Sequence, residues 1–190
     1  MLDSIKKITT FVQTILDAKI KSGDIVIDGT MGNGNDTLFL ARTVGPTGKV
    51  FSFDIQSIAL ENTTQKINDH KLNHYNIELI NDSHENIEKY VIDTVDAAMF
   101  NLGYLPKGDH SIITKANTTI KAISSILNIL KPGGIISIII YYGHEGGSEE
   151  KEEVLKFLNE LPNNDVTVMQ CNYINHSNNP PIIIFIEKNK

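Results

Sequence analysis

The residues of this chain best suited to chemistry form a glycine-rich segment at positions 28–37, with the sequence DGTMGNGNDT. Apolar residues 25–27 precede it and a helical pattern begins at Leu38, so we expect a strand, a tight turn and a helix. Glycines in such a turn let backbone N–H groups approach a ligand closely, and the start of a helix offers further N–H groups. The segment therefore predicts a loop that holds a nucleotide-like cofactor.

The polar composition of this loop separates two such cofactors. A dinucleotide loop needs a third glycine where the helix packs beside the pyrophosphate, but Asn-Asp-Thr follows Gly34 here. Side-chain donors and acceptors suit the ammonium and carboxylate of an amino acid better, which favours S-adenosylmethionine over a nicotinamide dinucleotide. We expect these loop residues to bind it: Asp28, Thr30, Gly32, Asn33, Gly34, Asn35, Asp36 and Thr37.

Polar residues after the next two predicted strands complete the cofactor site, because ligands of doubly wound sheets lie beyond the carboxyl ends of the strands. Asp54 ends the second strand and is expected to accept both hydroxyl protons of an adenosine ribose, with Gln56 beside the ribose or base edge. Asp82, Ser83 and His84 follow the third strand, where they would meet the adenine. Helix capping by Asp82 or Ser83 is the structural alternative.

Strands and helices alternate along the chain and predict how these residues are positioned. We expect strands at residues 24–28, 49–54, 77–80, 96–100, 135–141, 166–171 and 182–187, and helices at 36–44, 57–71, 84–91, 112–130 and 149–161. Apolar residues at helical spacing add an N-terminal amphipathic helix within residues 1–22, packed on a single domain that spans residues 1–190.

The strands are rich in β-branched residues and lack polar alternation, which is typical of a parallel sheet covered on both faces. No helix separates the last two strands, so the final strand is expected to turn antiparallel. The predicted fold is α/β, a Rossmann-like doubly wound sheet of seven strands.

Composition limits the partners and the chemistry. The net charge of −6 argues against a general nucleic-acid coat, although lysines outnumber acids between residues 101 and 140, so RNA could dock on one patch. No histidine pair has metal-ligand spacing, and Cys171 is the only cysteine, so we expect no metal site. No apolar run is long enough to span a membrane and no signal sequence is recognised, which leads us to expect a cytoplasmic protein.

Three segments together give the chain a resemblance to the YtqB-like/MnmM family of class I S-adenosylmethionine-dependent methyltransferases. They are the loop at 28–37, the segment NLGYLPKGDH at 101–110, and YGHEGG at 142–147 followed by Glu149. The resemblance covers essentially the whole chain. It implies methylation of the 5-aminomethyl group of (2-thio)uridine at the tRNA wobble position, with the anticodon region as partner. A homodimer stays open, since two subunits could be needed to present enough positive surface to a tRNA.

The resemblance also implies which residues serve the methyl acceptor. Asn101 and the Leu102 carbonyl would accept hydrogen bonds from the amine, as Asn-Pro-Pro-Tyr segments do in relatives that methylate adenine, although Leu-Gly replaces the two prolines here. Tyr104 would stack on a flipped base. The expected catalytic residues are Asn101, Tyr104 and His144, and the expected substrate contacts are Leu102, Lys107, Asp109, His110 and Tyr142.

Several alternatives stay open on the sequence. Asp109, His110, Tyr142 and His144 all follow strands four and five, so any of them could act as a general base, and positioning of a neutral amine could suffice without one. Methylation of rRNA or of a small molecule would use the same machinery. An NAD-dependent oxidoreductase or a catalytically silent binding module is less favoured.

Overall fold

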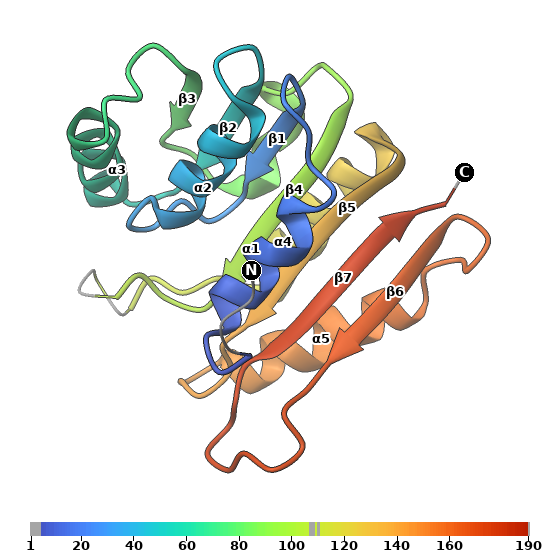
Figure 1. The fold of residues 1–190 in the computed structure, drawn as a ribbon. Helices are drawn as coiled ribbons and strands as arrows, with labels where there is room; N and C mark the ends of the chain where they lie inside the picture. Colours follow the sequence, from blue (N-terminus) through green and yellow to red (C-terminus); the bar gives the residue numbers. More distant parts are fainter. Residues whose placement is uncertain (1–4, 107–108, 110, 190) are drawn as a thin grey trace.

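The computed structural model describes residues 5–106, 109 and 111–189 (Figure 1). The strands are β1 (Ile25–Asp28), β2 (Lys49–Phe53), β3 (Asn76–Ile80), β4 (Val95–Leu102), β5 (Leu130–Ile140), β6 (Val166–Cys171) and β7 (Ile182–Lys188). The helices are α1 (Ile8–Asp17), α2 (Asn35–Val44), α3 (Ser57–Asp69), the 3-10 helix η1 (His84–Lys89), α4 (Ala116–Ile129) and α5 (Gly147–Asn159).

All seven strands form one sheet in the order β3-β2-β1-β4-β5-β7-β6. The strand pairs from β3 to β5 are parallel, whereas β7 runs antiparallel to both β5 and β6. The sequence order reverses between β1 and β4, which is where doubly wound sheets bind their ligands. The predicted mostly parallel sheet with an antiparallel last strand is confirmed.

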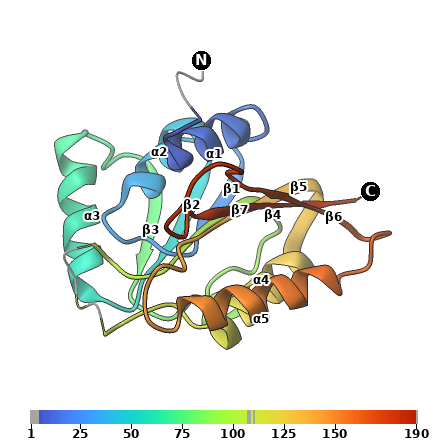
Figure 2. The same ribbon diagram turned by 90° about the horizontal axis from the view of Figure 1, so that it is seen from below.

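Two layers of helices cover the sheet (Figure 2). Side chains alternate between the faces of a strand, so Val26 of β1 packs with Val12 of α1 and Leu40 of α2. Ile27, its neighbour, packs on the other face with Ile126 of α4. A central strand such as β1 is thus apolar on both sides, which explains its unbroken apolar run in the sequence.

The N-terminal helix α1 is amphipathic. Ile8, Val12 and Leu16 lie four residues apart and are buried against the sheet. Phe11 contacts Phe185 of β7 edge to face, with ring centroids 6.4 Å apart. No helix among the described residues is long and apolar enough to cross a membrane.

Three predicted elements differ from those observed. Residues 84–91 form the short 3-10 helix η1 rather than an α-helix. Residues 112–115 precede α4, and Ile113 instead bridges to Tyr104. Residues 131–134, expected to end a helix, bulge from β5: Val95 of β4 pairs with Leu130, and Ala97 pairs with Ile135. Pro132 has no N–H to donate to the neighbouring strand, which is why the pairing is interrupted here.

Candidate functional site

A cavity of about 760 Å³ opens at the carboxyl ends of the parallel strands. The segments that follow β1, β2 and β3 line it, together with the ends of β4 and β5 and the start of α4. The cavity collects most of the predicted site residues: Thr30, Gly32, Asn33, Asn35, Asp36, Asp54, Gln56, Asp82, Ser83, His84, Asn101, Leu102 and Tyr104.

Asp28 and Thr37 support the glycine loop from behind. Asp28 is fully buried and accepts hydrogen bonds from the Thr30 N–H at 3.2 Å and from the Thr37 hydroxyl at 2.6 Å. Burial, reinforced by the negative charge of Asp36, raises the pKa of Asp28 to about 7. Neither Asp28 nor Thr37 is among the described residues that line the cavity, so both act in this structure through the loop, and their predicted contact with the cofactor stays a prediction.

Gly34 shapes the glycine loop. It is not among the described residues that line the cavity. Its φ of 73° is left-handed, and a Cβ there would lie 2.6 Å from the Thr63 hydroxyl oxygen of α3. Asn33 and Asn35 flank it, and each binds α3 through a side-chain hydrogen bond, to Asn62 and Lys66 respectively. The glycine therefore lets the loop pack tightly on α3.

Asp54 is fixed with both carboxylate oxygens at the cavity wall. One oxygen accepts the Gly32 N–H at 2.9 Å, and the other accepts the Gln56 N–H at 2.9 Å. A carboxylate oxygen can accept more than one hydrogen bond, so each retains capacity for a hydroxyl of a ligand. This geometry fits the predicted contact with the two ribose hydroxyls.

The segment after β3 combines capping with cavity lining. Ser83 caps η1 by accepting the Glu85 N–H, and Asp82 accepts hydrogen bonds from the side chains of Asn86 and Tyr90. Burial lowers the pKa of His84, whose Nδ1 lies 3.0 Å from the Gly29 carbonyl oxygen. Because a carbonyl only accepts, Nδ1 carries the proton and the buried Nε2 is an acceptor without a partner among the described residues.

Asn101 is held by contacts with Thr30 and Asp36, and Asp36 is held in turn by α1. Its backbone N–H donates to the Thr30 hydroxyl at 2.7 Å, and its side-chain amide donates to Asp36 at 2.6 Å. The other Asp36 oxygen accepts the side-chain amide of Gln13, from α1, at 2.7 Å. The Asn101 Oδ1 is therefore fixed as an acceptor, and it is buried without a partner among the described residues.

The other residues that were predicted to contact the methyl acceptor do not all face the cavity. The Leu102 carbonyl accepts the Tyr141 N–H at 2.9 Å, so it is already engaged within the sheet. Tyr142 packs against the hydrophobic core, with the Lys151 ammonium 4.5 Å from its ring centroid. Tyr141, which the sequence interpretation missed, lines the cavity instead. Both tyrosines lie just after β5, and Tyr141 still donates its N–H to Leu102 of β4. The choice between the two adjacent tyrosines therefore depended on how the chain leaves the sheet.

His144 contacts Tyr104 and is not among the described residues that line the cavity. The two rings meet edge to face with centroids 5.5 Å apart, and Tyr104 is 43% exposed. In this structure His144 supports Tyr104, and its predicted catalytic role stays a prediction. Asp109 accepts hydrogen bonds from the backbone and the hydroxyl of Ser111, while Lys107 and His110 lie outside the described residues.

A buried carboxylate that the sequence interpretation missed anchors the loop after β4. The Gly103 N–H donates to the Thr114 hydroxyl at 2.8 Å, which donates in turn to Glu150 at 2.6 Å. Thr119 donates to the second Glu150 oxygen at 3.0 Å. Burial raises the pKa of Glu150, and nothing in its position within an acidic run distinguished it from its exposed neighbours.

The charges around the glycine loop favour a cationic ligand. Asp36 and Asp54 face the cavity and Asp28 lies close enough for both to raise its pKa. Such a surface stabilises a sulfonium and an ammonium, and it repels the phosphates of a dinucleotide. Together with the unpartnered acceptors of His84 and Asn101, these residues fit S-adenosylmethionine. The described residues contain no cluster of histidine, cysteine or acidic side chains that could hold a metal ion.

Known proteins share this sequence and this fold. The family described as "Putative rRNA methylase" matches residues 50–187. The "tRNA (mnm(5)s(2)U34)-methyltransferase, chloroplastic" of Arabidopsis thaliana is 38% identical over 96% of this chain and 70% of its own length.

Two solved structures agree with this match. A "putative rRNA-methylase" from Clostridium thermocellum is 48% identical, with a TM-score of 0.92 over 95% of this chain and 96% of its own. A "putative methyltransferase" from Streptococcus mutans, solved in complex with SAH, is 41% identical, with a TM-score of 0.85 over 99% of both chains.

Proposed function

We propose that this chain, which belongs to the "Putative rRNA methylase" family and is an S-adenosylmethionine-dependent methyltransferase, methylates a wobble uridine of tRNA. The reaction is methylation of the 5-aminomethyl group of (2-thio)uridine, which gives 5-methylaminomethyl-2-thiouridine. The name of the 38% identical plant relative supports this choice of acceptor. The single structural observation that carries it is the buried, unpartnered Asn101 Oδ1 beside Asp36.

A primary amine needs an acceptor that holds its hydrogens and leaves its lone pair free. S-adenosylmethionine supplies an electrophilic methyl group at the cavity. The Asn101 Oδ1 accepts one amine N–H, which directs the nitrogen lone pair toward that methyl group. Thr30 and Asp36 prevent rotation of Asn101, so the orientation is set before the substrate binds.

The loop after β4 supplies a surface for the base itself. Tyr104 is partly exposed, lines the cavity and is braced by His144, an arrangement that suits stacking on an extruded base. The anchor through Thr114 to Glu150 holds the backbone of this loop. We assign these residues to binding of the anticodon region.

The proposed reaction is tested on purified tRNA that carries 5-aminomethyl-2-thiouridine. Incubation with the protein and S-adenosylmethionine should convert this nucleoside to its N-methylated form, as detected by mass spectrometry of nucleoside digests. Unmodified transcript of the same tRNA is the control and should gain no methyl group. Methylation of rRNA in place of the tRNA, or of neither, would overturn the proposed acceptor.

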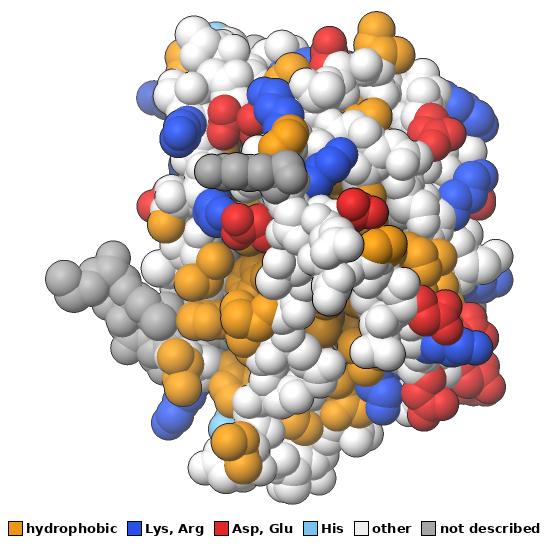
Figure 3. All heavy atoms as spheres, turned by 90° about the vertical axis from the view of Figure 1, so that its right-hand side faces the viewer, with side chains coloured by type: hydrophobic (Ala, Val, Ile, Leu, Met, Phe, Trp, Pro, Cys, Tyr) orange, Lys and Arg blue, Asp and Glu red, His pale blue; other side chains and the backbone are white. Residues whose placement is uncertain are grey.

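We also propose that two copies associate through the outer strand β6. Among the described strands it pairs only with β7, and Met169 on it is 53% exposed. Ile174, in the segment after β6, is 99% exposed. Figure 3 shows hydrophobic side chains gathered on this side of the molecule. An unpaired strand edge with apolar side chains favours pairing with another chain.

A further inference from the structure

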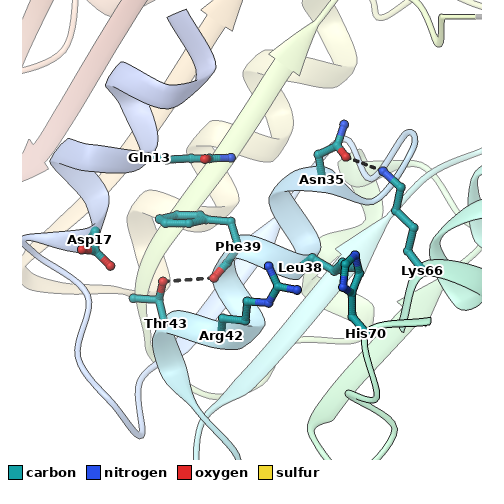
Figure 4. Close-up of a pocket in the computed structure, with 9 residues that line it drawn as sticks. All are labelled: Gln13, Asp17, Asn35, Leu38, Phe39, Arg42, Thr43, Lys66 and His70. Carbon is teal, nitrogen blue, oxygen red and sulfur yellow. Dashed lines mark hydrogen bonds between the residues drawn. The ribbon is translucent and has the colours of Figure 1, made fainter. Parts of the chain in front are cut away.

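A second hollow, of about 520 Å³, extends the candidate site along the outer surface of α2. Residues of α2 form its floor, and α1 and α3 form its two walls (Figure 4). Gln13 and Asn35 line both this groove and the main cavity, so the two are continuous. Any chain-like substrate whose reacting unit occupies the main cavity has this groove available for its neighbouring units.

Basic side chains outnumber acidic ones in the groove although the whole chain carries a net charge of −6. Arg42, the only arginine of the sequence, extends from α2 (Figure 4). Lys66 projects from α3, and His70 is the residue that caps the C-terminal end of that helix. Lys66 donates to the neutral Asn35 side chain, so its charge is not compensated there. Asp17 on α1 is the one acidic lining residue, and within the described part of the chain no ion pair joins it to Arg42.

We propose that this groove binds the phosphate backbone of the RNA substrate next to the methylated nucleotide. This inference rests on the proposed function, because it assumes an RNA acceptor in the main cavity. Arginine and lysine are the side chains that proteins use to contact phosphates, and such contacts position the nucleic acid without reading its sequence. Asn35 and Arg42 are seven residues apart on α2, about 10 Å along its axis, and stacked nucleotides of one strand repeat about every 3.4 Å. The groove therefore accommodates a few nucleotides.

The test measures binding of a synthetic anticodon stem-loop RNA by fluorescence anisotropy over a series of salt concentrations, with SAH present. Arg42→Gln should raise the Kd roughly 5- to 20-fold and make the dependence of log Kd on log salt shallower by about 0.7, the loss of one phosphate contact on a single strand. Arg42→Lys should recover part of the affinity, because it restores the charge. Lys156→Gln is the matched control: it removes an exposed lysine from α5, on the opposite face of the sheet, and should leave both quantities unchanged.

Two further measurements, of SAH affinity and of sedimentation, separate the outcomes. SAH affinity of Arg42→Gln should stay within about two-fold of the unmodified protein, because Arg42 is not among the residues lining the main cavity. Identical RNA binding by Arg42→Gln and Lys156→Gln would overturn the groove as a phosphate site. A change in sedimentation with unchanged RNA binding would overturn it too and assign the groove to a contact between copies.

The groove and the proposed reaction fail in different ways. If the unmodified protein methylates the aminomethyl nucleoside but Arg42→Gln shows an unchanged KM for tRNA, only the groove is wrong. If RNA binding depends on Arg42 but no aminomethyl nucleoside is methylated, only the proposed reaction is wrong.

Discussion

Asn101 can accept a hydrogen bond from a substrate because its neighbours already bind its other polar groups. Thr30 accepts its N–H and Asp36 accepts its side-chain amide, which leaves one oxygen free in a buried position. Leaving a buried acceptor unpaired costs about 1–3 kcal/mol, a cost that a bound amine would offset. The residue is thus destabilising in the free protein and favourable in a complex.

Asn101→Ala should leave the affinity for S-adenosylmethionine nearly unchanged and slow methyl transfer. The variant lacks the acceptor that orients the amine, and we expect a loss of roughly 100-fold in the single-turnover rate. Rapid quench with radiolabelled methyl donor measures this rate, and calorimetry measures the affinity. A rate equal to that of the unmodified protein would remove Asn101 from the mechanism.

Asp54→Ala should weaken binding of S-adenosylmethionine by about 1–3 kcal/mol, since hydrogen bonds to a charged acceptor are lost. Titration calorimetry provides the measurement, and Asp69→Ala is the control, because Asp69 is an exposed carboxylate at the end of α3. Unchanged affinity would show that Asp54 does not hold the ribose.

The raised pKa of Asp28 makes the stability of the protein depend on pH. The folded state retains the proton up to about pH 7, whereas the unfolded chain releases it near pH 3.8. The stabilising contribution is therefore complete below pH 3.8 and is lost as the pH rises through 7. Relative to Asp28→Asn, whose side chain does not titrate, the unmodified protein should lose roughly 1–4 kcal/mol of unfolding free energy between pH 4 and 8.

Urea unfolding at several pH values measures the difference between the two proteins. This difference reports on Asp28 and on the two carboxylates coupled to it, Asp36 and Asp54, because the more distant groups titrate equally in both proteins. A difference that stays constant from pH 4 to 8 would contradict the raised pKa.

At the scale of elements, α1 does more than cover the sheet. Val12 and Leu16 pack α1 against the sheet. This packing places Gln13 within hydrogen-bond distance of Asp36 and places Thr9 in the cavity wall. The N-terminal helix thereby becomes part of the site that the carboxyl ends of the strands define. The same helix forms one wall of the basic groove.

Gln13→Ala should lower the turnover number roughly 10-fold, the kinetic equivalent of one hydrogen bond of about 1.4 kcal/mol. The variant frees Asp36, so Asn101 is oriented less well, while the apolar face of α1 remains intact. Thr14→Ala on the same helix is the control, because the Thr14 hydroxyl bonds only within α1, to the Thr10 carbonyl. Equal effects of both variants would indicate a general disturbance of α1 and contradict the specific role.

At the scale of the whole molecule, the charges are distributed unevenly. Acidic residues surround the cofactor loop, and the basic groove lies directly beside them although the chain as a whole is negative. A cationic methyl donor and an anionic nucleic acid can then bind side by side on one small domain. The outer strand β6 lies at the far edge of the sheet, which leaves the site open if two copies pair there.

Met169→Asp should shift a dimer toward monomer, since a charge would be buried in the contact. Sedimentation velocity over a concentration series should show a dissociation constant at least roughly 10-fold higher. Ile92→Asp introduces the same charge at another exposed apolar residue, away from β6, and should have no effect. A monomeric unmodified protein at all concentrations would contradict the proposed association.

Local patterns in the sequence determined the fold class and the cofactor loop. Apolar strands, helical periodicity and the glycines at 32 and 34 depend on neighbours in sequence, so the alternating α/β order and the cofactor class were predicted correctly. The role of Asp54 as a ribose contact was predicted on the same basis and stays a prediction.

Only the tertiary structure decided which polar residues face the cavity. The pairing of Gln13 with Asp36 spans 23 residues, and that of Asn101 with Asp36 spans 65. Tyr141 rather than Tyr142 lines the cavity at the point where the chain leaves β5. Glu150 is buried where Thr119 of α4, and Thr114 just before that helix, donate to its carboxylate. Such contacts depend on how distant elements pack, and no local spacing in the sequence encodes that packing.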